Sequence, residues 1–312
     1  MKQDISGCKA ALPYNYHTHT ELCDGSASLE AMVLSAIQKG MKVLGFSGHC
    51  YTAYDDSYCM SRENTILYKQ EIQRLRQVYG EQICILCGIE QDFGSDEPTD
   101  DYDYVIGSVH AIFADAESSS DSFYGFDRNK FRYIDWSTDK ITEAIASDFG
   151  GDPYAFINRY YKIVAMLPEV TGCDIIGHFD LVTKFNEKSK WFDESSEEYR
   201  AAVRTALDRI FESQSSASSI RKARRRSLEH PDAPIFEINT GAMSRGWRSS
   251  PYPAADILSE IRRRGGKIII NSDSHSVNTI DYAFRDAAEL AKACGFNEAC
   301  CINEQGFASF KL

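Results

Sequence analysis

Apolar and polar positions along this chain follow two alternating periods, which predict strands and helices in turn. Short apolar runs bounded by turn residues predict seven strands, at 11–20 with its exit loop, 42–46, 82–89, 102–109, 174–176, 235–238 and 267–270. Apolar residues at helical spacing predict helices at 29–40, 62–79, 138–147, 153–167, 196–212, 254–264 and 281–294. The repeated alternation favours a parallel sheet, open or closed into a barrel. Because no linker interrupts it, we expect a single domain over residues 1–312.

Local signals refine two parts of this pattern. Ser26 and Ser28 are the candidate N-caps of the first helix, and the helix at 196–212 could continue into the serine-rich residues 213–219. Residues 114–132 are rich in Ser, Asp and aromatic residues without a clear period. We interpret that stretch as a long loop near a functional site, or as a lid.

The histidines gather where the predicted strands end. His17 and His19 are two residues apart, so on a strand both side chains point to one face, and Asp24 follows closely. Six of the seven histidines follow predicted strands, as do two acidic residues; these are His17, His19, His49, His110, His178, His275, Glu90 and Asp273. Each alone has an ordinary structural explanation, and His230 is expected to be solvated. Together they should meet on the rim that the carboxyl ends of barrel strands share.

This set of donors predicts a metal site. Histidine with aspartate and glutamate, without a cysteine thiolate motif, suits Zn, Mn or Fe. Eight or nine ligands exceed the needs of one ion, so two or three ions are expected. Such a cluster generates hydroxide at neutral pH and clamps a phosphoryl group.

The amino-acid composition limits the kinds of molecule that the protein is expected to bind. Hydrophobic residues make up 43% of the chain and charged residues 26%, with a formal net charge of -12. That charge disfavours nucleic acid and anionic membranes and suits a small cationic substrate. Residues 1–11 lack the apolar core of a signal peptide, no apolar run reaches membrane-span length, and the basic run 221–226 is expected to be a solvated face. The ten cysteines, including Cys84 and Cys87, are expected to be reduced thiols of a cytoplasmic protein.

Several motifs together resemble the PHP family (polymerase and histidinol phosphatase). They are the His17-x-His19 start, Gly48-His49, Ile89-Glu90, Ser108-Val109-His110, Ile176-Gly-His-Phe-Asp180 and Ser272-Asp-Ser-His275, which span nearly the whole chain. The stretch from Glu237 to Pro253 is similar to the histidinol-phosphatase branch. The resemblance implies an α/β fold, a distorted (β/α)7 barrel, with a trinuclear divalent metal centre at the C-terminal ends of the strands. This fold agrees with the seven units counted from the periodicity.

The resemblance also implies a ligand set for each ion. His17, His19, Glu90 and Asp273 would hold the first ion. Asp24, His49 and His275 would hold the second, and Glu90, His110 and His178 the third, with Glu90 as a bridge. Some relatives have His in place of Asp24, which leaves the choice among Zn, Mn and Fe open.

The activity implied is hydrolysis of L-histidinol phosphate to L-histidinol and phosphate in histidine biosynthesis. Arg245 and Asp273 are the expected catalytic residues. Arg245 is the first candidate for the phosphate contact, with Arg248 as the reserve and Trp247 beside the substrate. The ammonium and imidazole of the substrate should meet carboxylates or aromatic rings; the candidates are Asp135, Tyr51 and Trp247. Glu237 and Asn239 are expected to support the ligands from behind.

Two alternatives remain open at this stage. One is a phosphoesterase of the same family that acts on another small phosphoester or a nucleotide. The other is a noncatalytic metal-binding accessory domain. Every expected ligand position is filled, which favours an active enzyme.

Overall fold

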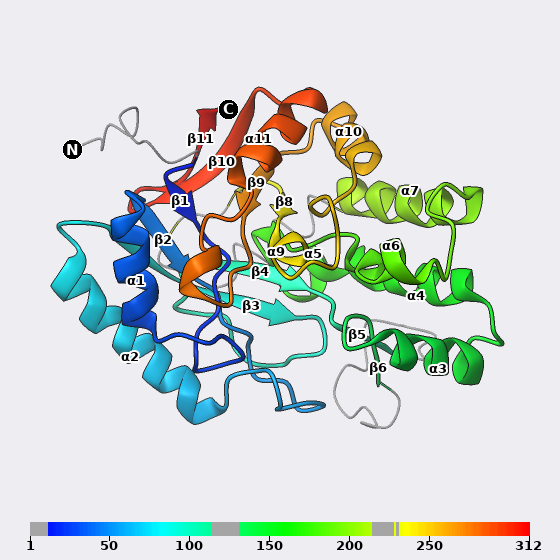
Figure 1. The fold of residues 1–312 in the computed structure, drawn as a ribbon, viewed down its shortest axis with the longest axis horizontal. Helices are drawn as coiled ribbons and strands as arrows, with labels where there is room; N and C mark the ends of the chain where they lie inside the picture. Colours follow the sequence, from blue (N-terminus) through cyan, green and yellow to red (C-terminus); the bar gives the residue numbers. More distant parts are fainter. Residues whose placement is uncertain (1–11, 114–130, 214–227, 229–230) are drawn as a thin grey trace.

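Seven parallel strands surround one core in the computed structural model, which describes residues 12–113, 131–213, 228 and 231–312 (Figure 1). In sheet order the strands are β1 (Tyr14–Asn15), β2 (Val43–Phe46), β3 (Cys84–Asp92), β4 (Tyr104–Ser108), β7 (Ile175–Ile176), β8 (Ile235–Asn239) and β9 (Ile268–Asn271). A parallel bridge between Thr18 and Ser274 joins the two edges at the C-terminal ends of the strands. The fold is therefore a nearly closed barrel, and the predicted seven-unit α/β architecture is confirmed.

Helices cover the outside of the strands. They are α1 (Leu29–Gln38), α2 (Arg62–Tyr79), α3 (Thr138–Asp148), α4 (Pro153–Val164), α5 (Leu167–Val170), α6 (Asn186–Ser189), α7 (Glu197–Glu212), α9 (Gly241–Ser244), α10 (Ala255–Arg263) and α11 (Phe284–Ala293). Serine side chains accept a hydrogen bond at the first turn of α1, α2, α3 and α7, which fixes where these helices begin. Ser28 caps α1 as expected, whereas Ser26 donates to the carbonyl oxygen of His275. The predicted helix 153–167 is two helices, because the chain turns at Ala165 and Met166.

Two antiparallel hairpins were not predicted. One pairs β5 (Ala111–Phe113) with β6 (Phe131–Tyr133), so the predicted loop 114–132 is wrong at its end; its remainder lies outside the described residues. The other pairs β10 (Glu298–Asn303) with β11 (Gly306–Lys311). His230, the basic run and the serine-rich stretch after α7 also lie outside the described ranges.

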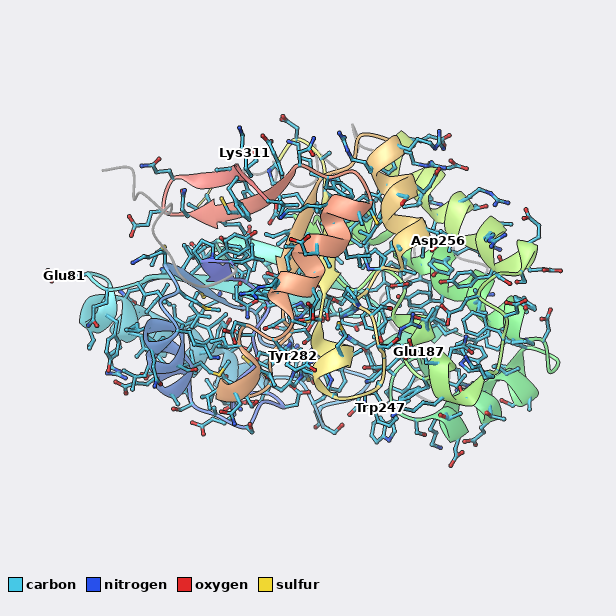
Figure 2. The ribbon with its side chains drawn as sticks, turned by 45° about the horizontal axis from the view of Figure 1, so that its top comes forward. Glu81, Glu187, Trp247, Asp256, Tyr282 and Lys311 are labelled. Atoms are coloured by element: carbon cyan, nitrogen blue, oxygen red, sulfur yellow. The ribbon has the colours of Figure 1, made fainter. Side chains whose placement is uncertain are left out.

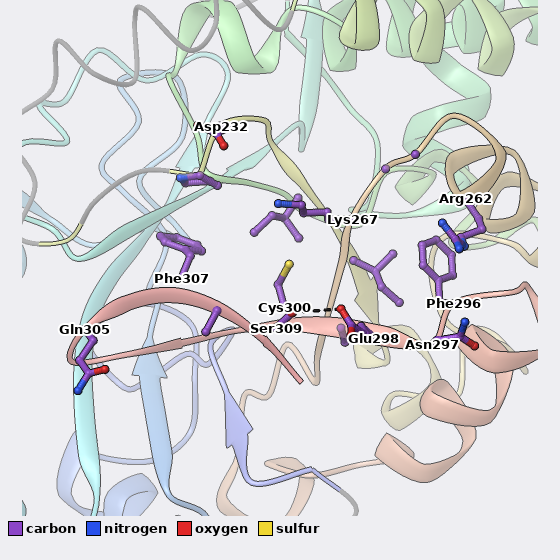
Figure 3. Close-up of a pocket in the computed structure, with 17 residues that line it drawn as sticks. Asp232, Arg262, Lys267, Phe296, Asn297, Glu298, Cys300, Gln305, Phe307 and Ser309 are labelled. Atoms are coloured by element: carbon purple, nitrogen blue, oxygen red, sulfur yellow. Dashed lines mark hydrogen bonds between the residues drawn. The ribbon is translucent and has the colours of Figure 1, made fainter. Parts of the chain in front are cut away.

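The second hairpin lies at the amino ends of the barrel strands (Figure 1). The Tyr16 hydroxyl donates to the carbonyl oxygen of Ile302 at 2.7 Å and accepts from its amide at 2.8 Å. A cavity of about 740 Å³ is lined by residues of the hairpin, by Lys267 and Ile268, and by the end of α10 (Figure 3). This end of the barrel is thus far from the histidines, which leave the opposite ends of the strands.

Strand residues alternate between the barrel interior and the helices. Cys84 and Leu86 point inward, while Ile85 and Cys87 join the core under the helices. Tyr104 fills the interior, and an added Cβ at Gly88 would lie 2.2 Å from its ring. Further along the same inward rows the residues become polar, at Glu90, Ser108, Glu237 and Asn271. This change from apolar to polar positions marks the floor of a polar site.

Candidate metal centre

The barrel closure brings together two segments that are more than 250 residues apart. The amide of His19 donates to the carbonyl oxygen of Ser274 at 2.8 Å, and the amide of Ser274 donates to that of His17 at 3.1 Å. Behind them, the Asn15 side chain donates to the Ser272 hydroxyl at 2.7 Å. These contacts place the histidine pair beside Asp273 and His275.

Glu90 lies at the centre of the site. Its Oε2 lies 2.9 Å from His49 Nδ1 and 3.3 Å from His17 Nε2, and its Oε1 lies 3.0 Å from His178 Nε2. His110 Nε2 is 3.5 Å from Oε1. Glu90 was predicted to follow strand β3, but it lies within it, because the strand continues to Asp92 by pairing with β4. Its carboxylate is nevertheless in reach of the histidines expected to share it.

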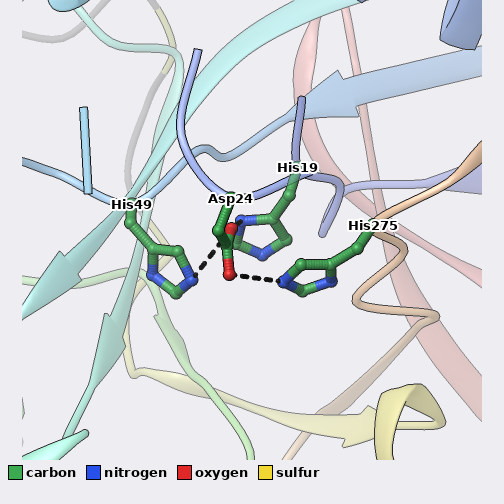
Figure 4. A group of neighbouring side chains, drawn as sticks. All are labelled: His19, Asp24, His49 and His275. Atoms are coloured by element: carbon green, nitrogen blue, oxygen red, sulfur yellow. Dashed lines mark ion pairs between the residues drawn. The ribbon is translucent and has the colours of Figure 1, made fainter. Parts of the chain in front are cut away.

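A second cluster surrounds Asp24 (Figure 4). The carboxylate of Asp24 lies 3.2 Å from His275 Nε2, 3.7 Å from His49 Nε2 and 3.6 Å from His19 Nδ1. The rings of His19 and His275 are stacked with centroids 4.1 Å apart. Four donors from three segments of the chain thus face a common point.

Asp273 is held in an unusual conformation beside Arg245. Its φ is 49°, in the left-handed region that Asp adopts more easily than most residues. Its Oδ1 lies 3.1 Å from His19 Nε2, while its Oδ2 accepts from Arg245 Nη2 at 3.1 Å. Gly241 permits this approach, since an added Cβ would lie 2.6 Å from Asp273 Oδ2. One carboxylate therefore links the arginine to the histidine cluster.

Two buried carboxylates orient imidazoles from behind. Glu237 accepts from His17 Nδ1 at 2.7 Å, and Asp92 lies 2.9 Å from His110 Nδ1. A carboxylate in this position fixes the ring so that Nε2 faces the site as an acceptor. The position of Glu237 agrees with the support expected of it, and Asn239 in turn donates to Glu237 at 2.9 Å. Sequence reasoning missed Asp92, although it is two residues after Glu90 on the same face of β3.

The electrostatics keep the carboxylates charged. Burial would raise the pKa of Glu90, but His49, His17 and His110 lower it well below its usual value. Burial would likewise raise the pKa of Asp273, and Arg245 and His17 lower it well below its usual value. Burial, reinforced by His275 and His49, lowers the pKa of His19 to about 3, so that imidazole is neutral at physiological pH. His19 and the two carboxylates are thus in the protonation states that bind metal ions.

The donor atoms fit a metal cluster. His17 Nε2, His19 Nε2 and Glu90 Oε2 are buried without a hydrogen-bond partner among the described residues. In each of three overlapping groups, the possible ligand atoms lie within 4.8 Å of one another. The groups are His19, Asp24, His49 and His275; His17, His19 and Glu90; and His49, Glu90 and His110. Burying such nitrogen and oxygen atoms without hydrogen-bond partners lowers the stability of the fold unless a cation binds them.

Two cavities open above these donors and share five lining residues. Besides the five shared residues, the inner cavity of 170 Å³ is lined by Glu90, His178, Leu181, Arg245, Asp273 and His275. Besides the same five residues, the outer cavity of 330 Å³ is lined by Ser57, Tyr58, Tyr133 and Trp136. The shared residues are Asp24, His49, His110, Asp135 and Lys184. The two cavities are therefore continuous with each other.

Some residues predicted to touch substrate line these cavities, and others do not. Arg245 and Asp135 do. Arg248 is buried elsewhere, where it donates to the carbonyl oxygen of Thr183 at 3.0 Å. Trp247 lies at the edge of the molecule with 37% of its surface exposed (Figure 2), and Tyr51 packs under the guanidinium of Arg62.

The cavities also contain residues that sequence reasoning did not single out. They are Lys184, Tyr58, Tyr133 and Trp136. All four lie in connecting segments or at the end of a short hairpin, where no period marks a residue as facing the site. Lys184 is four residues after Asp180 of the Ile176–Asp180 motif, which is the only signal that could have pointed to it.

The PHP domain family matches residues 15–215. This chain belongs to the PHP family. This PHP domain is 24% identical over 313 aligned positions to the "Probable histidinol-phosphatase" of Schizosaccharomyces pombe, covering 94% of this chain and 90% of the relative. It is 26% identical to the "Histidinol-phosphatase" of Bacillus subtilis, covering 86% of this chain and 95% of that protein.

A solved structure shares the fold of this PHP domain. It is the histidinol phosphate phosphatase of Lactococcus lactis, in complex with zinc, L-histidinol and phosphate. The TM-score is 0.63 at 19% identity, and the match covers 95% of this chain and 98% of the other. This similarity confirms the fold and agrees with the barrel built from the contacts above.

Proposed function

We propose that this protein is a metal-dependent histidinol-phosphatase, a phosphoric monoester hydrolase that converts L-histidinol phosphate to L-histidinol and phosphate. The observation that carries the proposal is the convergence of six imidazoles and three carboxylates beside one arginine at the mouth of the barrel. The names of the relatives, which the chain matches over most of their length, supply the substrate. The zinc, histidinol and phosphate of the Lactococcus lactis structure support the same assignment.

Three divalent ions are proposed to occupy the site. The first would be held by His17, His19, Glu90 and Asp273, the second by Asp24, His49 and His275, and the third by Glu90, His110 and His178. When bound, such ions act as Lewis acids toward phosphoryl oxygens and make a nucleophile available at neutral pH. Zinc in the Lactococcus lactis structure favours zinc, while the oxygen ligand Asp24 keeps Mn and Fe as candidates.

The residues of the chain position the substrate. Arg245 is proposed to contact the phosphoryl group in the inner cavity, because the Asp273 carboxylate orients its guanidinium and 33% of the side chain stays exposed. A guanidinium presents paired donors that match phosphate oxygens. Leu181 provides an apolar wall, and Glu237 and Asp92 hold the rings of His17 and His110 in place. The site is thus organised before substrate enters.

The remaining expectations follow from the same picture. The partner is a small phosphoester, and neither nucleic acid nor a membrane is proposed as one. Within the described ranges, none of the helices combines the length and apolar composition needed to cross a membrane. A cytoplasmic location and a single domain over residues 1–312 remain predictions, and the oligomeric state is unassigned.

The test is phosphate release from L-histidinol phosphate, compared with a nucleotide and an aryl phosphate, after loading with Zn, Mn or Fe. We expect a strong preference for L-histidinol phosphate that is lost in His17→Ala. Comparable rates on all three esters would leave a phosphoesterase but refute the substrate. A folded, metal-loaded protein without turnover would point instead to the metal-binding accessory domain.

A further inference from the structure

The outer cavity differs in character from the inner one. The inner cavity is lined by Arg245 and by seven of the nine proposed metal ligands. The residues found only in the outer cavity are Ser57, Tyr58, Tyr133 and Trp136. We call this outer space the aromatic chamber; its polar junction with the inner cavity is formed by Asp135 and Lys184. A phosphate held in the inner cavity would leave the organic part of its ester in the chamber.

Three rings form the walls of the aromatic chamber. Tyr58 stands edge-on to His49, with ring centroids 5.0 Å apart, and its hydroxyl lies 2.8 Å from that of Tyr54. Tyr133 and Trp136 form a tilted pair with centroids 4.9 Å apart. Trp136 keeps 57% of its surface exposed, although large aromatic side chains usually contribute most when covered. Ring faces attract cations and stack on flat groups, so these walls favour a planar or cationic ligand.

Asp135 provides a negative charge at the junction. Lys184 donates to its backbone oxygen at 2.9 Å and to Oδ2 at 3.2 Å. Among the described contacts Oδ1 accepts from nothing, so one carboxylate oxygen is open to a donor from a ligand. Burial would raise the pKa of Asp135, but Lys184 and His110 lower it, which keeps the carboxylate charged at neutral pH.

The ion pair of Asp135 with Lys184 suits a zwitterionic ester. Both residues line both cavities, so a positive and a negative side chain lie where the phosphoryl and organic parts of a substrate would join. An ester of an amino alcohol carries a phosphate and an ammonium separated by a few bonds. The ammonium can donate a hydrogen bond to Asp135 Oδ1, and Lys184 adds a positive charge on the side of the phosphate.

We propose that the aromatic chamber and Asp135 form the leaving-group subsite, and that this subsite selects phosphate esters of cationic, nitrogen-bearing alcohols. The inference rests on the proposed phosphatase function. Asp135 is the residue that determines charge specificity, and the three rings receive the flat or cationic end of the alcohol. A neutral ester can enter the chamber but makes no ion pair there, and an anionic ester is repelled.

The experiment measures kcat/KM of the metal-loaded protein for a series of phosphate monoesters. The series contains L-histidinol phosphate and ethanolamine phosphate as cationic esters, phenyl phosphate and glycerol 3-phosphate as neutral ones, and 3-phosphoglycerate as the anionic one. We expect the order cationic, neutral, anionic. In Asp135→Asn, kcat/KM for the cationic esters should fall about tenfold, as for the loss of one charge-assisted hydrogen bond. The fall for the neutral esters should be smaller, because they make no ion pair with Asp135.

Two further measurements separate recognition from structural damage. Calorimetric binding of L-histidinol to the metal-loaded protein should weaken by about the same factor of ten in Asp135→Asn, with metal content unchanged. Asp139→Asn is the matched control, since Asp139 is exposed on α3 and lines neither cavity. Trp136→Leu removes an exposed ring and should weaken L-histidinol binding without lowering the melting temperature.

The outcomes distinguish this inference from the proposed function. If Asp135→Asn lowers kcat/KM equally for all esters, or Trp136→Leu leaves L-histidinol binding intact, the subsite is refuted while the phosphatase stands. If L-histidinol phosphate is a poor substrate but the charge order collapses in Asp135→Asn, the subsite stands and the assigned substrate is refuted.

Discussion

Glu237→Gln tests the buried support of the site most directly. Glu237 is fully buried and accepts four hydrogen bonds, two at each oxygen. His17 Nδ1 and Asn271 Nδ2 donate to Oε1, at 2.7 and 2.9 Å. The His178 amide and Asn239 Nδ2 donate to Oε2, both at 2.9 Å. Glutamine has the same shape, but its amide nitrogen must replace one of these oxygens and face two donors.

The magnitude follows from that count. Two buried donors lose their acceptor whichever way the amide points, at about 1–3 kcal/mol each. Burial would raise the pKa of Glu237, but His17 lowers it below its usual value. The carboxylate is therefore charged, and its hydrogen bonds are at the strong end of the range. We expect the free energy of unfolding of the metal-free protein to fall by about 2–6 kcal/mol. Metal affinity should fall about 10- to 100-fold, because His17 loses the partner that orients it.

The assay combines denaturant unfolding of the metal-free protein with metal retention against a graded competing chelator. Glu289→Gln is the control: Glu289 is 66% exposed on α11 and pairs with Lys292, so its loss should cost under about 1 kcal/mol and no metal. A Glu237→Gln protein that unfolds like the control and retains its metal would refute the support assigned to this carboxylate.

Three other predictions concern the metal centre, the barrel interior and the surface of α10. Removing the metals with a chelator should lower the melting temperature and be reversed by reloading, because bound ions stabilise only the folded site; an unchanged melting curve would contradict the proposed centre. Tyr104→Phe should cost about 1–3 kcal/mol in denaturant unfolding, because the carbonyl oxygens of Tyr16 and Phe46, 2.5 and 3.0 Å from the hydroxyl, lose their buried donor. Hydrogen bonds from Arg263 and then Arg264 lower the pKa of Glu260 from 4.5 to about 2, although slight burial opposes them. The ionised carboxylate therefore stabilises the fold above pH 4.5, and this stabilisation is lost as pH falls towards 2. The stability difference between wild type and Glu260→Gln should therefore shrink over that range, by under about 1 kcal/mol since the pair is solvent-screened, and a difference that grows towards acid would contradict the sign.

The helices and strands predicted best are those in which the spacing of apolar residues matches the buried positions. Strand β8 and helix α7 agree with the predicted ranges within a residue, because a buried strand and a one-sided helix each leave a regular apolar pattern. The β5–β6 hairpin left no such pattern, since in the part of the chain that the structure describes its short strands pair only with each other. The apolar pattern ends the predicted strand at Ile89, three residues before β3 ends, because a buried carboxylate interrupts an apolar run in the same way as a strand end.

The sequence by itself determined the barrel and the donors at its rim. Parallel strands must deliver their last residues to one side, so a histidine after a strand is already placed by the chain order. Only the tertiary structure decided which loop residues join them. Arg248 and Arg245 are three residues apart, yet one is buried against Thr183 and the other lines the cavity. Asp135, Lys184 and Trp136 meet across the cavity mouth because separate loops pack together, and such packing depends on contacts between distant segments that no local pattern records.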